Sequence, residues 1–167
     1  MFKFNEFGTF STSPSQMARF KSGDLWPVWE ARYPMLFDSD DIRLARAQAH
    51  LGYHFHEWLA AILIYESVGY LSLIEKYEFK NHARKQAILK DLVPRSVLEV
   101  VNKRTPERKA QCPDLLCFAP DMSDWFFCEV KGPTDTVKPN PETFFQRLVD
   151  CSGKPIFLVK FHTLNSG

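Results

Sequence analysis

A glutamate and a lysine, two positions apart, follow an aromatic run in the second half of the chain. Glu129 and Lys131 are separated by Val130, and the pair Pro113-Asp114 precedes an earlier apolar run. Side chains alternate between the two faces of a strand, so the acid and the lysine share one face. An acid and a lysine opposite an aspartate on a partner strand form a group that suits Mg²⁺.

The two apolar runs flank a polar turn, which predicts a β-hairpin with strands at about 114–119 and 125–131. Hydrolysis of a phosphodiester needs stabilised charge on the phosphate and a deprotonated water. A Mg²⁺ ion provides both, and it prefers carboxylate oxygens. Asp114 and Glu129 are the predicted ligands, and Lys131 is predicted to orient the attacking water or offset phosphate charge. The alternative is a solvent-exposed acid–lysine strand face.

These residues need a sheet to hold them, and the remaining pattern supplies one. We predict four helices and two further strands, with helices at about 41–51, 53–68, 83–92 and 140–152 and strands at 96–101 and 155–161. The order predicts an α/β sandwich around a small mixed β-sheet flanked by helices.

The start of the chain has a different character. Residues 1–24 are polar and punctuated by phenylalanine, and 26–34 are aromatic and rich in turn formers. We predict a loosely held N-terminal arm and connection over 1–40, followed by one domain over 41–167. The phenylalanines of the arm could dock on the body of the protein or on a protein partner.

Composition excludes several classes. Apolar residues make up 45% and charged residues 25% of 167, which is ordinary for one globular domain. The four cysteines form no CxxC pair, the N-terminus lacks a leader pattern, and no apolar run is long enough to span a membrane. We therefore expect a cytoplasmic protein that does not contact a membrane.

Positive charge is concentrated in the stretch that runs from just before the third predicted helix to just before the hairpin. From Lys80 to Lys109 there are nine Lys or Arg against three acids, a balance of +6. Such a surface could contact phosphates or could be a solvated helix face. The predicted DNA contacts are Arg84, Lys85, Arg104, Arg108 and Lys109.

The hairpin also resembles a known superfamily. Pro113-Asp114 with Glu129-Val130-Lys131 is similar to the PD-(D/E)XK nuclease motif. The continuation Gly132 to Asp135, with Gln146 farther on, resembles the VRR-Nuc branch, which includes stand-alone phage and bacterial nucleases and the nuclease domain of Fanconi-associated nuclease. The resemblance covers about residues 50–162.

The resemblance implies a restriction-endonuclease-like core and a Mg²⁺- or Mn²⁺-dependent DNA nuclease. It implies that Asp114, Glu129, Lys131 and Gln146 are catalytic, and that the Val130 backbone carbonyl joins the metal ligands. The expected substrate is flapped or branched DNA, in repair, recombination or phage biology.

The superfamily also commonly has a glutamate on a helix before the sheet. The candidates here are Glu57, Glu66 and Glu75. We favour Glu57 as a catalytic residue and metal ligand, because related nucleases often show a glutamate, an apolar helix and then Gly-Tyr, as at Gly69-Tyr70. Glu66 lies on an equally apolar stretch and stays open as the alternative.

One rival site is a zinc centre. His50 and His54 have the i, i+4 spacing of two helical zinc ligands, and His56 follows. Gly52 lies between them and no HExxH pattern is present, so we favour a surface or core role for these histidines.

Three functions follow from the sequence. The first is a DNA endonuclease that acts as a monomer or a homodimer. The second is a non-catalytic DNA-binding module that retains the nuclease fold. The third is a protein-interaction factor that uses the phenylalanine-rich arm.

Overall fold

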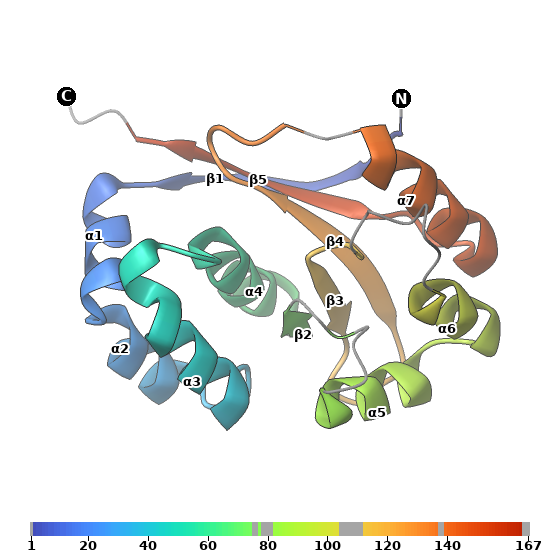
Figure 1. The fold of residues 1–167 in the computed structure, drawn as a ribbon, viewed down its shortest axis with the longest axis horizontal. Coiled ribbons are helices and arrows are strands. Elements are labelled where there is room, and N and C mark those ends of the chain that lie inside the picture. The colour runs from blue at the N-terminus through green and yellow to red at the C-terminus, as the bar shows by residue number, and fades with distance from the viewer. Residues whose placement is uncertain (1, 75–76, 78–81, 104–111, 137–138, 165–167) are drawn as a thin grey trace.

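The computed structural model describes residues 2–74, 77, 82–103, 112–136 and 139–164 (Figure 1). Helices dominate its first half and strands its second. The elements in chain order are β1 (Asn5–Thr12), α1 (Pro14–Ser22), α2 (Leu25–Arg32), α3 (Ser39–Gln48), the 3₁₀ turn η1 (Ala49–Leu51), α4 (Phe55–Val68), β2 (Leu71–Ile74), α5 (Ala83–Leu92), α6 (Arg95–Asn102), β3 (Leu115–Phe118), β4 (Trp125–Lys131), α7 (Pro139–Ser152) and β5 (Phe157–Thr163).

The five strands form one mixed sheet in the order β1-β5-β4-β3-β2. The β2–β3 and β3–β4 pairs are antiparallel, whereas β4–β5 and β1–β5 are parallel. A parallel step needs a crossover, and α7 supplies the one between β4 and β5. The predicted α/β class, a small mixed sheet flanked by helices, is confirmed.

Helices cover both faces of the sheet. Figure 1 shows α1 to α4 on one side and α5 to α7 on the other. Alternate residues of β3 divide between the two apolar clusters: Leu115 and Cys117 pack with the first group of helices, and Leu116 and Phe118 with the second. Burial on both faces explains why β3 is apolar throughout rather than alternating.

The prediction of a loosely held N-terminal arm is wrong. Residues 5–12 form β1, which pairs with β5 along its whole length. Phe2 and Phe4 pack edge-on against Phe145 of α7, and Phe20 of α1 is fully buried. The first 40 residues thus share the sheet and core of the rest of the chain, and these phenylalanines serve the protein's own packing.

Two other segments differ from prediction. The aromatic stretch predicted as a turn-rich connection is helix α2, which buries Trp26 and Trp29. Residues 96–101, predicted as a strand, form most of α6. Val97 and Val101 are both fully buried and lie i, i+4 apart, so they form one helical stripe.

The remaining elements match the predictions closely. Helix α4 ends at Gly69, which adopts the left-handed conformation that favours glycine (φ 75°). Helix α5 ends just before Pro94, and α3, α7 and β5 lie within a few residues of their expected bounds. Strand β2 was not anticipated, since its four residues lie in a stretch without clear periodicity.

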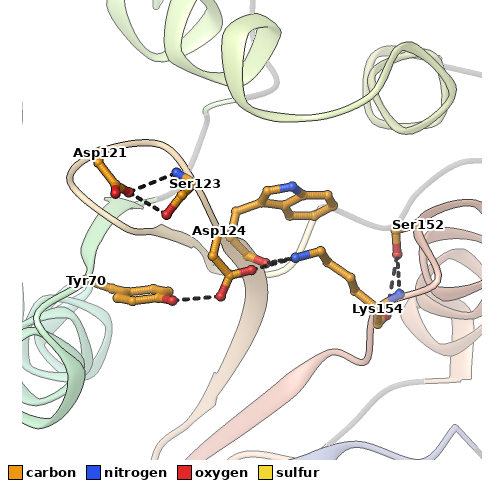
Figure 2. Close-up of polar contacts among 7 residues, drawn as sticks. Tyr70, Asp121, Ser123, Asp124, Ser152 and Lys154 are labelled. Carbon is orange, nitrogen blue, oxygen red and sulfur yellow. Dashed lines mark hydrogen bonds and ion pairs between the residues drawn. The ribbon is translucent and has the colours of Figure 1, made fainter.

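The turn of the β3–β4 hairpin is tied to two neighbouring loops. Figure 2 shows Asp124 between Tyr70 and Lys154. The Tyr70 hydroxyl donates to the Asp124 carboxylate at 2.7 Å, and the Lys154 ammonium donates to it at 2.8 Å. The Lys154 ammonium also lies 4.7 Å from the centre of the Trp125 ring. The hydrogen bonds from Lys154 and Tyr70 lower the pKa of Asp124 and anchor the end of the hairpin that lies away from Asp114.

No helix within the described ranges is long and apolar enough to cross a membrane. All four cysteines are free thiols, and three of them are buried.

Candidate active site

Asp114, Glu129 and Lys131 meet where β3 begins and β4 ends. Leu115 pairs with Cys128, so antiparallel register brings Asp114 opposite Glu129. The Lys131 ammonium lies 3.7 Å from a Glu129 carboxylate oxygen. The predicted hairpin therefore brings the acid pair and the lysine together at one end of the sheet.

Asp114 is fixed by its surroundings. One of its carboxylate oxygens accepts a hydrogen bond of 2.8 Å from the Val130 backbone N–H. The preceding carbonyl, that of Pro113, accepts a hydrogen bond of 2.6 Å from the hydroxyl of Tyr77, a fully buried residue. Tyr77 thereby positions the backbone that carries the candidate ligand, a role that no sequence motif indicated.

Proline at position 113 has a consequence for the Val130 carbonyl. The N–H and C=O of one strand residue point to the same side of the strand, so both Val130 groups are directed towards Asp114. Continuing the register by two residues places Pro113 opposite Val130. Proline has no N–H, so Pro113 cannot donate a backbone hydrogen bond to the Val130 carbonyl. The Val130 carbonyl therefore lies on the correct side of β4 to serve as a metal ligand with Asp114.

Glu129 is 7% exposed and its electrostatic environment is unusual. Burial raises the pKa of Glu129 well above its usual range, and the hydrogen bond and charge of Asp114 raise it further. The Lys131 ammonium opposes that shift. Carboxylates this close need a shared proton or a cation between them.

The structure separates two of the three candidate glutamates, and the third, Glu75, lies outside the described residues. Glu57, in the first turn of α4, lies near enough to Glu129 for its charge to raise the pKa of that group. Glu66, near the other end of α4, accepts a hydrogen bond from Tyr33 and lies 3.8 Å from Arg32. Burial and that hydrogen bond raise the pKa of Tyr33 to about 12. Of these two glutamates, Glu57 is therefore the one whose charge acts on the acid pair.

The segment that follows β4 packs closely on the start of α4. The Asp135 carboxylate accepts a hydrogen bond of 2.8 Å from the Gly132 N–H. A side chain at Gly132 would meet the His56 ring at 3.1 Å and Asp135 at 3.2 Å, so a larger residue would push these side chains aside by a few tenths of an ångström. Burial lowers the pKa of His56, whereas the charge of Asp135 opposes the shift. This contact holds the residue before Glu57 against the end of β4.

Within the described part of the chain, no three His, Cys, Asp or Glu side chains form a ready-made metal cage. The donors at the strand ends do fit a hard cation, because Mg²⁺ usually keeps several waters and binds only one or two carboxylates. The zinc hypothesis required His50 and His54 to lie on one helix, and the structure does not place them so. His50 lies in η1 and His54 in the turn before α4, so they do not share a helix face.

The residues predicted to contact DNA or the site from outside the hairpin differ in exposure and in partners. Arg84 is about half-exposed and pairs with Asp38 at 2.7 Å. Gln146 is exposed on α7, and its amide donates to Asp150 one turn farther on. The structure does not bring Gln146 to the acid pair, so its catalytic role stays a prediction. The other predicted contacts, Arg104, Arg108 and Lys109, lie outside the described residues.

Lys85 is wrong as a DNA contact, because it is a core residue. Its side chain is 8% exposed, and its ammonium lies 2.6 Å from Asp41 and donates to the Ile74 carbonyl at 2.8 Å. Charge counting along the sequence could not show this, since a buried lysine needs a partner that only the fold supplies.

Replacing Lys85 by alanine should therefore lower stability rather than DNA affinity. The change leaves Asp41 buried without its cation, which costs about 3–5 kcal/mol. Urea denaturation measures this, and Lys90→Ala on the exposed face of the same helix should change stability by no more than about 0.5 kcal/mol. Unchanged stability together with weaker, less salt-dependent DNA binding would contradict the core role of Lys85 and support a DNA contact.

No protein-family model matches the chain, and no curated protein matches it. One solved structure, the crystal structure of paFAN1 bound to 5′ flap DNA with a two-nucleotide flap and a gap, is similar with a TM-score of 0.42 and 20% identity. The match covers 90% of this chain and 32% of that chain, so this chain spans about a third of that protein. A likeness at this level does not define a shared function.

Proposed function

We propose that the chain is a metal-dependent nuclease that hydrolyses phosphodiester bonds of DNA. The observation that carries the proposal is the group formed by Asp114, Glu129 and Lys131, with Glu57 near it. Glu129 is buried and Asp114 is half-buried, so a charged pair of these carboxylates is unfavourable without a cation or a proton. A lysine 3.7 Å from Glu129 adds a charge suited to a phosphate. A purely structural strand face has no need of this arrangement.

The cation would be Mg²⁺ or Mn²⁺, held by Asp114, Glu129 and the Val130 carbonyl, with Glu57 as a further ligand. When bound, such an ion supplies a Lewis acid for the phosphate and a water of lowered pKa. The Val130 N–H keeps one Asp114 oxygen fixed, so the carboxylate is oriented before the cation arrives.

Lys131 is placed to act on the substrate. Its side chain is 22% exposed, so it reaches solvent while its stem stays packed. The ammonium can donate to an attacking water or to a phosphate oxygen on which charge builds up. A fixed charge of this kind is more effective in a partly buried site than in water.

The finer parts of the proposal concern the substrate and its setting. We propose an endonuclease that prefers flapped or branched DNA, in repair, recombination or phage biology, and that works in the cytoplasm. Arg84 is an exposed residue proposed to contact DNA, and Gln146, exposed on α7, stays proposed as a catalytic residue. A panel of duplex, flap and four-way DNA, with Mg²⁺ or Mn²⁺ and labelled at either end, tests preference and polarity, and sizing tests for a homodimer.

A matched pair of variants tests the helix glutamate. Glu57→Gln should lower metal-dependent cleavage about 10- to 100-fold, as expected for a group that supports or completes a metal site. Glu66→Gln, on the same helix, should leave cleavage unchanged because that carboxylate serves Tyr33 and Arg32. Initial rates at saturating Mg²⁺ measure both, and a larger loss from Glu66→Gln would contradict the assignment.

A non-catalytic DNA-binding module remains the second candidate. It is favoured by one observation, namely that the described residues include no closed cage of three metal ligands. This candidate predicts DNA binding without cleavage across the whole panel in either metal.

A further inference from the structure

A cavity of about 360 Å³ is lined by residues other than the candidate active-site residues Asp114, Glu129 and Lys131. It is bounded by α3, the start of α4, the end of β2 and the start of α5, and all the residues that line it are described. Its volume falls within the range of roughly 300–1,000 Å³ that is usual for small-ligand sites.

The floor of the cavity is polar and already satisfied. Asp41 and Lys85 form their ion pair there, and the Lys85 ammonium also donates to the Ile74 carbonyl. Trp58 and Leu44 supply apolar wall. A site with a fixed polar floor and an apolar wall suits a flat, partly polar ring.

The rim of the cavity carries an exposed acid and an exposed base that form a weak ion pair with each other. Asp40 and Arg43 both line the cavity, their side chains are 76% and 83% exposed, and their charged groups are 3.5 Å apart. A weak pair of this exposure contributes little to stability. It therefore leaves a carboxylate acceptor and a guanidinium donor side by side for a ligand.

The cavity lies at the end of the sheet where the candidate active site is. Ile74, which lines it, pairs with Leu115, and the residue before Leu115 is Asp114. Trp58, which also lines it, follows Glu57 along α4. Residues that line the cavity are therefore neighbours of candidate active-site residues at this end of the sheet.

We propose that the cavity takes up one unpaired nucleobase of the DNA substrate, with guanine preferred. This inference rests on the proposed function, which supplies DNA to this end of the sheet. An unstacked base is commonly held by an apolar wall and read by hydrogen bonds to its polar edge. A phosphate fits less well, because Asp40 and Asp41 balance the charges of Arg43 and Lys85.

The rim chemistry selects guanine. Guanine presents two neighbouring donors, N1–H and the N2 amino group, which a carboxylate such as that of Asp40 can accept together. Beside them is O6, an acceptor that arginine commonly reads. Adenine, cytosine and thymine do not combine two such donors with an adjacent acceptor.

Binding of free deoxynucleosides to the full chain without metal tests the cavity itself. We expect 2′-deoxyguanosine at millimolar concentration to cause saturable NMR shifts at amides of α3 and the first turn of α4. Ala47→Phe, at an exposed lining position, should weaken this binding at least tenfold by filling the mouth of the cavity. Ala31→Phe, at an exposed position of α2 that does not line the cavity, should bind like the unmodified chain.

Asp40→Asn tests the choice of base. It should weaken binding of 2′-deoxyguanosine about 5- to 150-fold, the range that corresponds to a bidentate contact of about 1–3 kcal/mol. The other three deoxynucleosides should be nearly unaffected. Shifts caused by inorganic phosphate alone, no saturable shift with 2′-deoxyguanosine, or equal binding by Ala47→Phe would each overturn the proposal.

These measurements test the base-binding site and the nuclease activity independently. Metal-dependent DNA cleavage without 2′-deoxyguanosine binding would refute the base site and leave the nuclease standing. Conversely, binding that is lost in Ala47→Phe, in a chain that cuts no DNA, would support the base site and refute the nuclease.

Discussion

Lys131→Ala should abolish most metal-dependent cleavage, with a fall in kcat of about 10²–10³-fold, as expected when one fixed donor to developing charge is removed. The ammonium lies 3.7 Å from Glu129 and is only 22% exposed, so water replaces it poorly. DNA affinity should change little, because a single phosphate contact is lost. Single-turnover rates with saturating enzyme separate the chemical step from binding.

Lys3→Ala provides the control for that experiment. Lys3 is exposed at the N-terminal end of the chain, so its removal should leave both kcat and melting temperature unchanged. A Lys131→Ala protein that melts normally yet cleaves at the full rate would show that the lysine is only part of a strand face.

Glu129→Gln should have opposite effects on activity and on stability. Cleavage should fall at least about 100-fold, because a neutral amide is a poor ligand for a hard cation. The metal-free protein should become more stable above pH 7, since the amide removes a buried charge while keeping the shape of the side chain. For a chain of this size the melting temperature rises by roughly 2–4 °C for each kcal/mol gained.

The pH dependence follows from the raised pKa of Glu129. Its protonated form is favoured in the folded state, so this contribution to stability is complete below the unfolded value near 4.5. It is lost as pH rises towards the raised folded value. Glu129→Gln should flatten that part of the metal-free stability profile, measured by urea denaturation between pH 4 and 9, and Mg²⁺ should offset the loss in the unmodified protein. A profile with the same slope in both proteins would be incompatible with a raised pKa of the buried Glu129.

Local patterns were sufficient for the elements nearest the site. The hairpin strands are short apolar runs separated by a turn of Pro, Asp and Ser residues, and both appear where predicted. Helices α4 and α5 carry their own stop signals, Gly69 and Pro94. Because the hairpin brings its strand ends together by register alone, the Asp114–Glu129 pairing was predictable without the rest of the fold.

Other elements depend on partners that are distant in the sequence. Strand β1 contains Gly8 and few aliphatic residues, and it pairs with β5 some 150 positions later, so no local pattern marks it. Residues 96–101 have strand-forming valines, but Val97 and Val101 pack on one helical stripe. Here tertiary packing overrides local propensity.

The same distinction applies to side chains. Glu57 and Glu66 both lie on apolar stretches of sequence. In the fold the charge of Glu57 raises the pKa of Glu129, whereas Glu66 accepts a hydrogen bond from Tyr33. Lys85 belongs to a basic run in the sequence, yet its partner Asp41 comes from another helix. Tyr77 lies in a stretch without clear pattern, although its hydroxyl supports Pro113.

The most direct test of the central claim is cleavage of labelled flap and four-way DNA by the purified chain and by Asp114→Asn, in Mg²⁺ and in EDTA. The proposed site predicts cleavage in Mg²⁺, none in EDTA, and a loss of at least about 100-fold in Asp114→Asn with an unchanged thermal melt. Cleavage by Asp114→Asn at the unmodified rate, or no metal-dependent cleavage of any DNA in the panel, would contradict it.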